Sequence, residues 1–273
     1  MQTRPFARAL SRLVLSALCL AACAAHADTV LITGANTGIG LEFAQEYAAR
    51  HWTVIATHRH AEVPPSLAAL ASRYPQVRIE HLDVTSQEDV TSLARKLAGA
   101  PIDVLINNAG VYADSHGLRT QDFGRFDFSL MDTILAVNVK GPLIVTQTLY
   151  PNVKASRQKK IVAISSTVGS LTDPYPGTGG VFYRASKAAL NREMQLLAQV
   201  VRVDGVSVLI MHPGVVQTER MSEYARKAGA RFVRDPDSLT PAQSVSQMIE
   251  TIERSGPKES GRFMRYDGKA LGW

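Results

Sequence analysis

Short apolar runs and longer amphipathic segments alternate along this chain. The apolar runs predict strands near residues 28–33, 52–58, 76–82, 102–107, 159–165, 206–211 and 261–266. Segments with apolar residues at helical spacing predict helices, and the clearest of these lie near 38–50, 86–98, 128–152, 181–203 and 240–255. Such an alternation is typical of an α/β domain whose parallel sheet is covered by helices on both faces.

Size and composition fit one such domain. The chain has 273 residues, of which 45% are hydrophobic, and this is enough to bury a large core. No internal repeat, low-complexity tract or interdomain linker interrupts the pattern. We therefore predict a single domain over residues 28–273.

The first 27 residues have a different composition. Arg4, Arg8 and Arg12 are their only charges, and the run from Leu13 to Ala25 is almost wholly apolar. Ala25-His-Ala27 fits a small-residue cleavage site, so residues 1–27 are typical of a secretory signal peptide. The apolar run is too short for a convincing transmembrane helix.

Other interpretations of this leader stay open. Leu20-Ala-Ala-Cys23 resembles a bacterial lipobox, and a lipid on Cys23 would place the protein at a membrane. An arginine-rich leader without acidic residues also fits a mitochondrial presequence. A start codon assigned too far upstream is the simplest alternative.

The charge balance argues against a nucleic-acid partner. The formal charge is +6, and removal of the three leader arginines leaves 27 basic against 24 acidic residues, or +3, which is too mild for that function. Both cysteines, Cys19 and Cys23, lie in the leader, so residues 28–273 offer no cysteine metal site. His58-x-His60 lacks a third ligand at a suitable spacing, and we predict no metal.

The most specific chemistry lies in Tyr183-Arg-Ala-Ser-Lys187. On a helix, the phenol and the ammonium project from one face because they are four residues apart. A cation beside a tyrosine favours the phenolate and lowers its pKa from about 10 toward a value useful for acid–base catalysis. Ser166 lies seventeen residues earlier, just past a predicted strand, at the sheet edge where parallel sheets bind ligands.

A glycine-rich turn, Thr33-Gly34-Ala-Asn-Thr-Gly38-Ile-Gly40, joins the first predicted strand to the first predicted helix. Glycines in such a turn let the backbone approach a pyrophosphate, which the helix N-terminus stabilises. The spacing is G-x-x-x-G-x-G rather than G-x-G-x-x-G. A tight turn that only needs glycine flexibility is the alternative interpretation of this motif alone.

Two further strands end in small or turn-forming residues. One is followed by Asn107-Asn108-Ala109-Gly110, and the other by His212-Pro213-Gly214-Val-Val-Gln-Thr218. With these motifs, the chain from about residue 28 to 218 resembles the short-chain dehydrogenase/reductase family, which carries the same elements in the same order. The resemblance implies a Rossmann-type doubly wound parallel sheet of about seven strands in the order 3-2-1-4-5-6-7.

The resemblance also implies roles for individual residues. Tyr183 would be the general acid or base and Ser166 would hydrogen-bond the reacting oxygen, with Ser165 the weaker candidate. Lys187 would lower the tyrosine pKa and hold the cofactor ribose, and Asn138 would position a water that links Lys187 to solvent. The predicted cofactor-binding residues are Gly34, Asn36, Thr37, Gly38, Ile39, Gly40, Arg59, Asp83, Asn108, Ala109, Gly110, Tyr183, Lys187, Pro213, Gly214, Val216 and Thr218.

The end of the second predicted strand bears on cofactor choice. An NAD-selective enzyme usually offers a carboxylate there, whereas this chain has His58 followed by Arg59. A guanidinium can grip a 2′-phosphate with two hydrogen bonds, so NADP is favoured over NAD. Asp83 matches the family position that meets the adenine, although a turn or cap residue is its alternative role.

These features predict an NADP-dependent oxidoreductase acting on a small carbonyl or alcohol substrate. The segments 182–191 and 261–273 resemble the carbonyl-reductase branch that includes bacterial C-factor. A non-catalytic NADP-binding regulator is the alternative, and a sugar-nucleotide epimerase or dehydratase a more distant one. The family often forms homodimers or homotetramers. Localisation stays open, because the leader favours export to the periplasm or a lipoprotein whereas the cofactor favours the cytoplasm.

Overall fold

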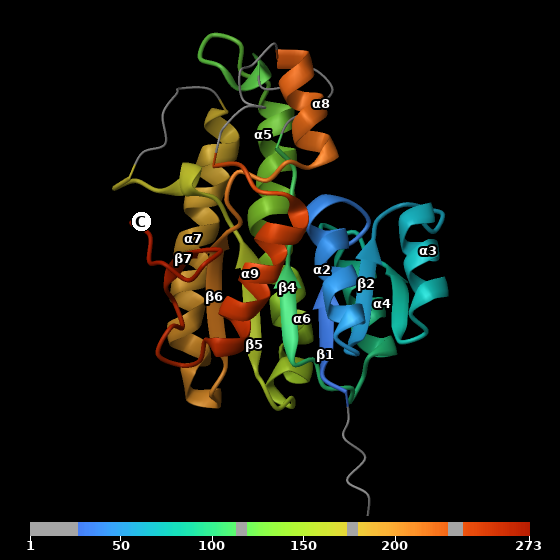
Figure 1. Cartoon of the computed structure of the whole chain (residues 1–273). Coiled ribbons are helices and arrows are strands. Elements are labelled where there is room, and N and C mark those ends of the chain that lie inside the picture. The colour runs from blue at the N-terminus through green and yellow to red at the C-terminus, as the bar shows by residue number, and fades with distance from the viewer. Residues whose placement is uncertain (1–26, 113–118, 174–179, 229–236) are drawn as a thin grey trace, which may run out of the picture.

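A computed structural model describes residues 27–112, 119–173, 180–228 and 237–273 (Figure 1). The predicted leader, with Cys19 and Cys23, lies outside the described residues apart from Ala27, as do residues 174–179 of the loop before Tyr183. The fold is a parallel sheet between two layers of helices.

Seven strands form one sheet in the order β3-β2-β1-β4-β5-β6-β7, and every neighbouring pair is parallel. The predicted order is therefore confirmed. The strands are β1 (Thr29–Ile32), β2 (Thr53–His58), β3 (Val77–His81), β4 (Val104–Asn107), β5 (Lys160–Ile164), β6 (Ser207–His212) and β7 (Phe263–Arg265).

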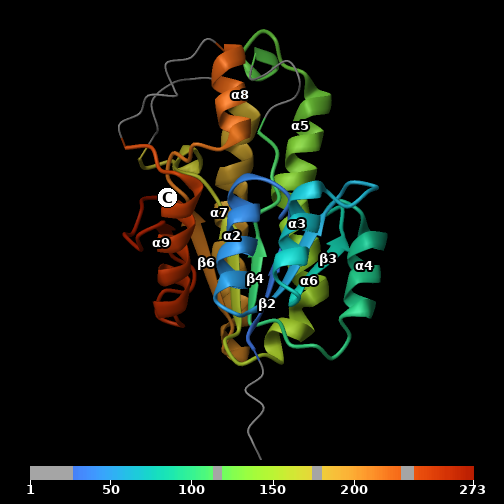
Figure 2. The same ribbon diagram turned by 45° about the vertical axis from the view of Figure 1, so that its right-hand side comes forward.

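The helices lie on both faces of this sheet (Figures 1 and 2). One face carries α2 (Gly38–Ala49), α3 (Pro65–Arg73) and α9 (Pro241–Arg254), and the other carries α4 (Gln87–Lys96), α6 (Gly141–Lys154) and α7 (Val181–Val201). Two further helices, α5 (Phe128–Leu135) and α8 (Glu219–Ala228), stand above the carboxyl edge of the sheet. The strand and helix ranges predicted from the sequence agree with these bounds to within a few residues.

Two hydrophobic cores follow from the strand period of two. Alternate residues of one strand enter opposite cores, as Val30 and Ile32 of β1 pack under α2 while Leu31 packs toward α6. The central strands are buried on both faces, which explains why their sequences are continuously apolar rather than alternating. Burial of the sheet on both faces leaves the carboxyl edge, where loops emerge, as the place for a site.

The long helix predicted near 128–152 is interrupted. A π-helical turn, η2 (Ala136–Lys140), joins α5 to α6, and Asn138 lies within it. Pro142 has no N–H, so the ordinary helical hydrogen bond to the carbonyl of Asn138 cannot form, and a widened turn accommodates this loss. Turns of this kind are frequent at functional sites.

By length and composition, Phe128–Lys154 is the one described helical stretch apolar enough to cross a membrane. Its apolar side chains instead serve the core of the domain. Val145, Leu149 and Val153 are fully buried against the sheet, together with residues of α4 and α7. We therefore assign this stretch to the core.

Candidate active site

The glycine-rich turn after β1 is hydrogen-bonded to the segment that follows the neighbouring strand β4. The Thr33 hydroxyl accepts hydrogen bonds from the backbone N–H groups of Asn108 and Ala109, both at 3.0 Å. In return, Asn108 Nδ2 donates to the carbonyls of Thr33 and Gly34, at 2.9 and 3.0 Å. These four bonds join the ends of β1 and β4 into one rigid platform.

Glycine is required at specific positions of this platform. Gly34 has φ +65° and Gly38 has φ +54°, a region that other residues seldom adopt. A Cβ on Gly40 would overlap both the carbonyl oxygen of Gly34 and the amide of Asn108. The turn therefore leaves its backbone bare beside the N-terminus of α2, as a cradle for an anionic group requires.

A cavity of about 430 Å³ opens over this cradle and is called the larger cavity here. Its lining includes the predicted cofactor residues Gly34, Asn36, Thr37, Gly38, Ile39, Gly40, Arg59, Asp83, Asn108, Ala109, Gly110 and Thr218. Sequence positions up to 184 residues apart thus meet on one surface. The size, the bare backbone and the helix N-terminus fit a dinucleotide.

The far end of the larger cavity is formed by the ends of β2 and β3. Arg59 and His60 line it and are both exposed, while His60 Nε2 lies 3.4 Å from the Asn36 side-chain amide. One oxygen of Asp83 accepts hydrogen bonds from the N–H and hydroxyl of Thr85, at 2.8 and 2.7 Å. The Thr85 bonds and the charge of Arg59 outweigh burial and lower the pKa of Asp83. Asp83 is thus a turn-capping residue that also lines the cavity.

Within the described residues no group of histidines, cysteines and carboxylates is placed to hold a metal ion. His58 is buried at the end of β2, and burial lowers its pKa. Its ring faces His60 and His81 at centroid distances of 6.4 and 6.0 Å.

A second cavity of about 200 Å³, called the smaller cavity here, adjoins the larger one. Its lining includes the predicted residues Ser166, Tyr183, Pro213, Gly214, Val216 and Thr218, together with Ser165, Tyr112, His212, Arg220 and Met221. The Ser166 and Tyr183 hydroxyls share a hydrogen bond. Both hydroxyls therefore face one small space at the end of β5.

Lys187 lies behind this pair rather than in either cavity. Its side chain is buried, with Nζ 2.9 Å from the carbonyl oxygen of Ile164 and 5.6 Å from the centre of the Tyr183 ring. Burial lowers the pKa of Lys187 to about 8 because a dense protein environment disfavours the ammonium. The ammonium thus supports the end of β5 and lies near the tyrosine ring.

The expected lowering of the tyrosine pKa is not found in the ligand-free chain. Tyr183 opens into the smaller cavity, yet enough protein surrounds its hydroxyl for burial to raise its pKa to about 12. The hydrogen bond from Ser166 opposes this rise only in part. Desolvation of the phenolate thus outweighs the hydrogen bond from Ser166.

Asn138 is fully buried in the π-helical turn. Its amide donates to the carbonyl of Val111 at 2.8 Å and to the Ser186 hydroxyl at 3.0 Å, and its carbonyl accepts from the N–H of Val111 at 2.8 Å. These three bonds of Asn138 are structural, because each joins it to another part of the protein. It ties the Asn-Asn-Ala-Gly segment to the catalytic-motif helix α7.

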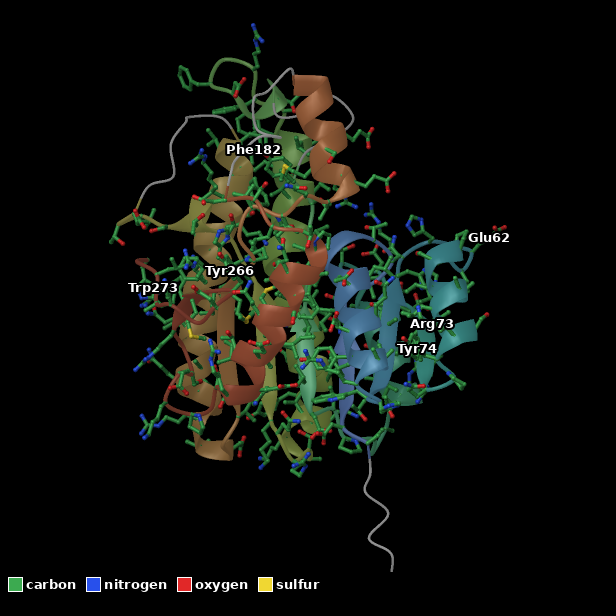
Figure 3. The ribbon with its side chains drawn as sticks, in the orientation of Figure 1. Glu62, Arg73, Tyr74, Phe182, Tyr266 and Trp273 are labelled. Carbon is green, nitrogen blue, oxygen red and sulfur yellow. The ribbon has the colours of Figure 1, made fainter. Side chains whose placement is uncertain are left out.

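The structure adds residues that the motifs did not indicate. Gln121 is fully buried, accepts from the Tyr183 N–H at 3.0 Å and donates to the Tyr112 carbonyl at 2.8 Å. The Tyr112 ring packs edge-on against Tyr183 at 4.7 Å. Phe182 packs beside Phe126 under α5, in the upper part of the molecule (Figure 3). A glutamine in a polar loop carries no sequence signal of such a role.

Ser165 and Ser166 have different surroundings although both line the smaller cavity. Ser165 donates to the Asn191 side chain and is buried, whereas Ser166 is half-buried and contacts Tyr183. The geometry therefore favours Ser166 for contact with a bound molecule.

Comparison with known proteins agrees with this architecture. Residues 28–229 match the family model described as short chain dehydrogenase. The chain belongs to the short-chain dehydrogenase family. It is therefore one of a family of oxidoreductases, and its seven-stranded sheet is the fold expected of that family.

Three individual proteins illustrate the similarity. The NADPH-bound carbonyl reductase from chicken fatty liver is 31% identical, with a TM-score of 0.79 over 91% of this chain and 100% of that one. The 1-hydroxy-2-glutathionyl-2-methyl-3-butene dehydrogenase of Rhodococcus sp. is 32% identical over 90% of this chain and all of its own. C-signal of Myxococcus xanthus is 33% identical over 67% of this chain and 99% of its own. The resemblance to the carbonyl-reductase and C-factor branch is thereby confirmed.

Replacement of Gly40 by alanine tests the cradle. We expect Gly40→Ala to lower the free energy of unfolding by roughly 1–3 kcal/mol, because the new methyl group must displace the Gly34 backbone. Nicotinamide cofactor affinity should fall at least about tenfold. Urea unfolding and fluorescence titration measure the two effects. Gly256→Ala, where nothing lies near the added Cβ, is the control and should change neither.

Burial of Lys187 predicts a pH dependence of stability. Its folded pKa of about 8 lies below the ordinary lysine value, so between these values the unfolded chain binds more protons and stability rises with pH. We expect the free energy of unfolding to increase from about pH 8 to pH 10. Lys187→Met should reduce this increase, leaving a part due to Lys160, whose pKa burial also lowers. An identical pH slope in the variant would contradict a buried, destabilised ammonium.

Proposed function

We propose that this protein is an NADP-dependent oxidoreductase that interconverts a carbonyl compound and its alcohol, in the manner of a carbonyl reductase. The observation that carries the proposal is the hydrogen-bonded pair of Ser166 and Tyr183 in a small cavity that opens into the larger one. A cofactor in the larger cavity and a carbonyl group beside Tyr183 would be neighbours.

A nicotinamide cofactor held in the larger cavity would supply a hydride to the carbonyl carbon in reduction and would accept one in oxidation. Tyr183 Oη gives its proton to the carbonyl oxygen as that oxygen gains negative charge, and Ser166 Oγ donates a hydrogen bond to the same oxygen. A tyrosine with a pKa of about 12 stays protonated at neutral pH, which is the form that reduction requires.

Lys187 and Asn138 line neither cavity and support this chemistry by holding the residues around it in place. Lys187 holds the end of β5 through Ile164, and this fixes Ser166 two residues further on. Its ammonium lies close enough to Tyr183 to stabilise the phenolate left after proton transfer. Asn138 is a positioning residue, since its bonds to Val111 and Ser186 set the distance between the cofactor platform and α7.

The cofactor is held by the cradle and selected at Arg59. Backbone N–H groups at Gly38 to Gly40 would face the diphosphate. Arg59 lines the adenosine end, where the usual carboxylate of NAD-selective enzymes is absent from the end of β2. A guanidinium there suits the 2′-phosphate of NADP, and the NADPH-bound carbonyl reductase with 31% identity supports this choice.

The proposed role of Tyr183 predicts a large loss of turnover when its hydroxyl oxygen is removed. We expect Tyr183→Phe to lower turnover of carbonyl substrates by about 10²–10⁴-fold, the usual contribution of a general acid, with NADPH affinity changed little. NADPH consumption with a panel of aldehydes and ketones measures the first quantity and fluorescence titration the second. Tyr150→Phe also removes a hydrogen-bonded phenol, here paired with Asp204, and should leave turnover unchanged. Wild-type protein that binds NADPH but turns over none of the panel would instead favour the non-catalytic regulator.

Cofactor selection is tested at Arg59. In the full chain, Arg59→Ala should weaken NADPH binding about 10- to 100-fold and leave NADH binding unchanged, because only NADPH carries the 2′-phosphate. The matched control is Arg73→Ala on α3, which lies outside both cavities near the labelled Tyr74 (Figure 3). Equal loss for both cofactors, or none, would refute the assignment of Arg59 to NADP.

A further inference from the structure

The two cavities share three lining residues, Ile39, Thr218 and Arg220. Ile39 belongs to the cradle, while Thr218 immediately precedes α8 and Arg220 lies in its first turn. The cradle and the start of α8 are in close contact, because a Cβ on Gly38 would lie 3.2 Å from Cγ2 of Thr218. Arg220 therefore lies at the junction between the two cavities, beside the cradle.

The cradle itself contains no cation. Its residues from Gly34 to Gly40 are uncharged, so it offers a diphosphate backbone N–H groups, the N-terminus of α2 and the neutral side chains of Asn36 and Thr37. Among the lining residues of the larger cavity, Arg59 lies at the adenosine end, whereas Arg220 lies at the junction. Two carboxylates, Glu219 and Glu223, line the same side. Arg220 is thus the guanidinium placed beside the cradle.

The contact that Arg220 makes in the ligand-free chain is weak. Its Nη1 donates to the carbonyl oxygen of Gly110 at 3.3 Å, in an exposed position, and within the described ranges it forms an ion pair with no carboxylate. A bond from an arginine to an exposed neutral carbonyl contributes little, whereas a charge-assisted bond to a phosphate is about twice as strong as a neutral one. A phosphate in the cradle would therefore draw the guanidinium from Gly110.

We propose that Arg220 is a cofactor-binding residue whose guanidinium exchanges the Gly110 carbonyl for the cofactor diphosphate and so joins α8 to the bound dinucleotide. The proposal rests on the proposed function, since it requires that a nicotinamide dinucleotide occupy the larger cavity. An anionic substrate group, such as a carboxylate, shares the chemistry that a guanidinium recognises. The diphosphate is favoured because Gly110 and Thr218 both line the larger cavity at the cradle.

The experiment compares ligands that differ in the diphosphate. NADPH, NADH and adenosine 2′-monophosphate, which has no phosphate at the 5′ position, are titrated against the full-length wild type, Arg220→Gln, Arg220→Lys and Arg59→Ala. We expect Arg220→Gln to weaken NADPH and NADH by the same factor, about tenfold, and to leave the affinity for the monophosphate unchanged. Arg220→Lys should keep part of the affinity, because it retains the charge but not the planar fork. Arg59→Ala should show the opposite pattern, with loss of affinity for NADPH and the monophosphate only.

A matched charge control removes the effect of net charge. Arg95→Gln changes the same residue type at an exposed position of α4 that lines neither cavity, and it should alter none of the affinities. Equal melting temperatures of the ligand-free variants establish that the fold is intact, as expected for an exposed side chain. If Arg220→Gln alone lowers the melting temperature, the comparison is made with Arg220→Lys against wild type.

Four outcomes would overturn the proposal. Unchanged NADPH and NADH affinities in Arg220→Gln would do so directly, as would an equal loss of affinity for adenosine 2′-monophosphate. If the cofactor affinities of Arg220→Gln are unchanged while its KM rises only for carbonyl substrates that carry a carboxylate, Arg220 binds the substrate instead of the cofactor. If the wild type binds neither cofactor, the proposed function itself fails. If the wild type and Arg220→Gln bind both cofactors with equal affinity, only the role of Arg220 is refuted.

Discussion

The reciprocal hydrogen bonds between Thr33 and Asn108 are the constraint on which the site depends. They join the ends of β1 and β4, which are neighbours in the sheet although the bonded residues are 75 positions apart in sequence. Strands β2 and β3 lie on one side of this junction, and β5, β6 and β7 lie on the other. The bonds require the two backbones to approach closely, and this approach is possible only because Gly34 and Gly40 have no side chains. The polar groups at this edge are therefore paired with each other rather than with water, and the cradle has its shape before any ligand arrives.

Hydrogen bonds of Asn138 and Lys187 connect this platform to the residues around the smaller cavity. Asn138 connects Val111, just past the platform, to Ser186 on α7, and Lys187 connects the next residue of α7 to the end of β5. Both side chains are buried, and burial of an ammonium is unfavourable, as the lowered pKa of Lys187 shows. The domain tolerates this cost because two large hydrophobic cores on either side of the sheet supply stability. A buried ammonium thus lies beside the proposed reacting hydroxyl.

Much of this arrangement could be predicted from the sequence, for a clear physical reason. Parallel strands that are buried on both faces need continuous apolar runs, so the number and positions of the strands can be recognised in the sequence. Glycines and prolines mark the turns at the ends of these strands. The glycine-rich turn, the Asn-Asn-Ala-Gly segment, Ser166 and Pro213-Gly214 each follow such a strand, whereas Tyr183 and Lys187 are recognised by their helical spacing. Their meeting at one edge is a consequence of parallel topology, and the strand order came from the family resemblance.

Other features depend on tertiary surroundings that no local pattern encodes. The π-helical turn at Asn138 arises from Pro142 together with a long-range pairing to Val111, and helical periodicity alone predicts an unbroken helix there. Gln121 and Arg220 lie in polar segments, where glutamines and arginines are ordinary surface residues. The direction of the Tyr183 pKa shift depends on how the burial of two groups balances their attraction, and spacing four residues apart indicates only that they are neighbours.

The raised tyrosine pKa has a consequence for both directions of the proposed reaction. A reduced nicotinamide ring is uncharged, so with NADPH bound Tyr183 stays protonated, the form suited to donate a proton to a carbonyl oxygen. An oxidised ring is positively charged, and a positive charge nearby favours the phenolate, the form suited to accept a proton from an alcohol. Burial raises the pKa of Tyr183, and a positive charge held beside its hydroxyl would act in the opposite sense and lower it.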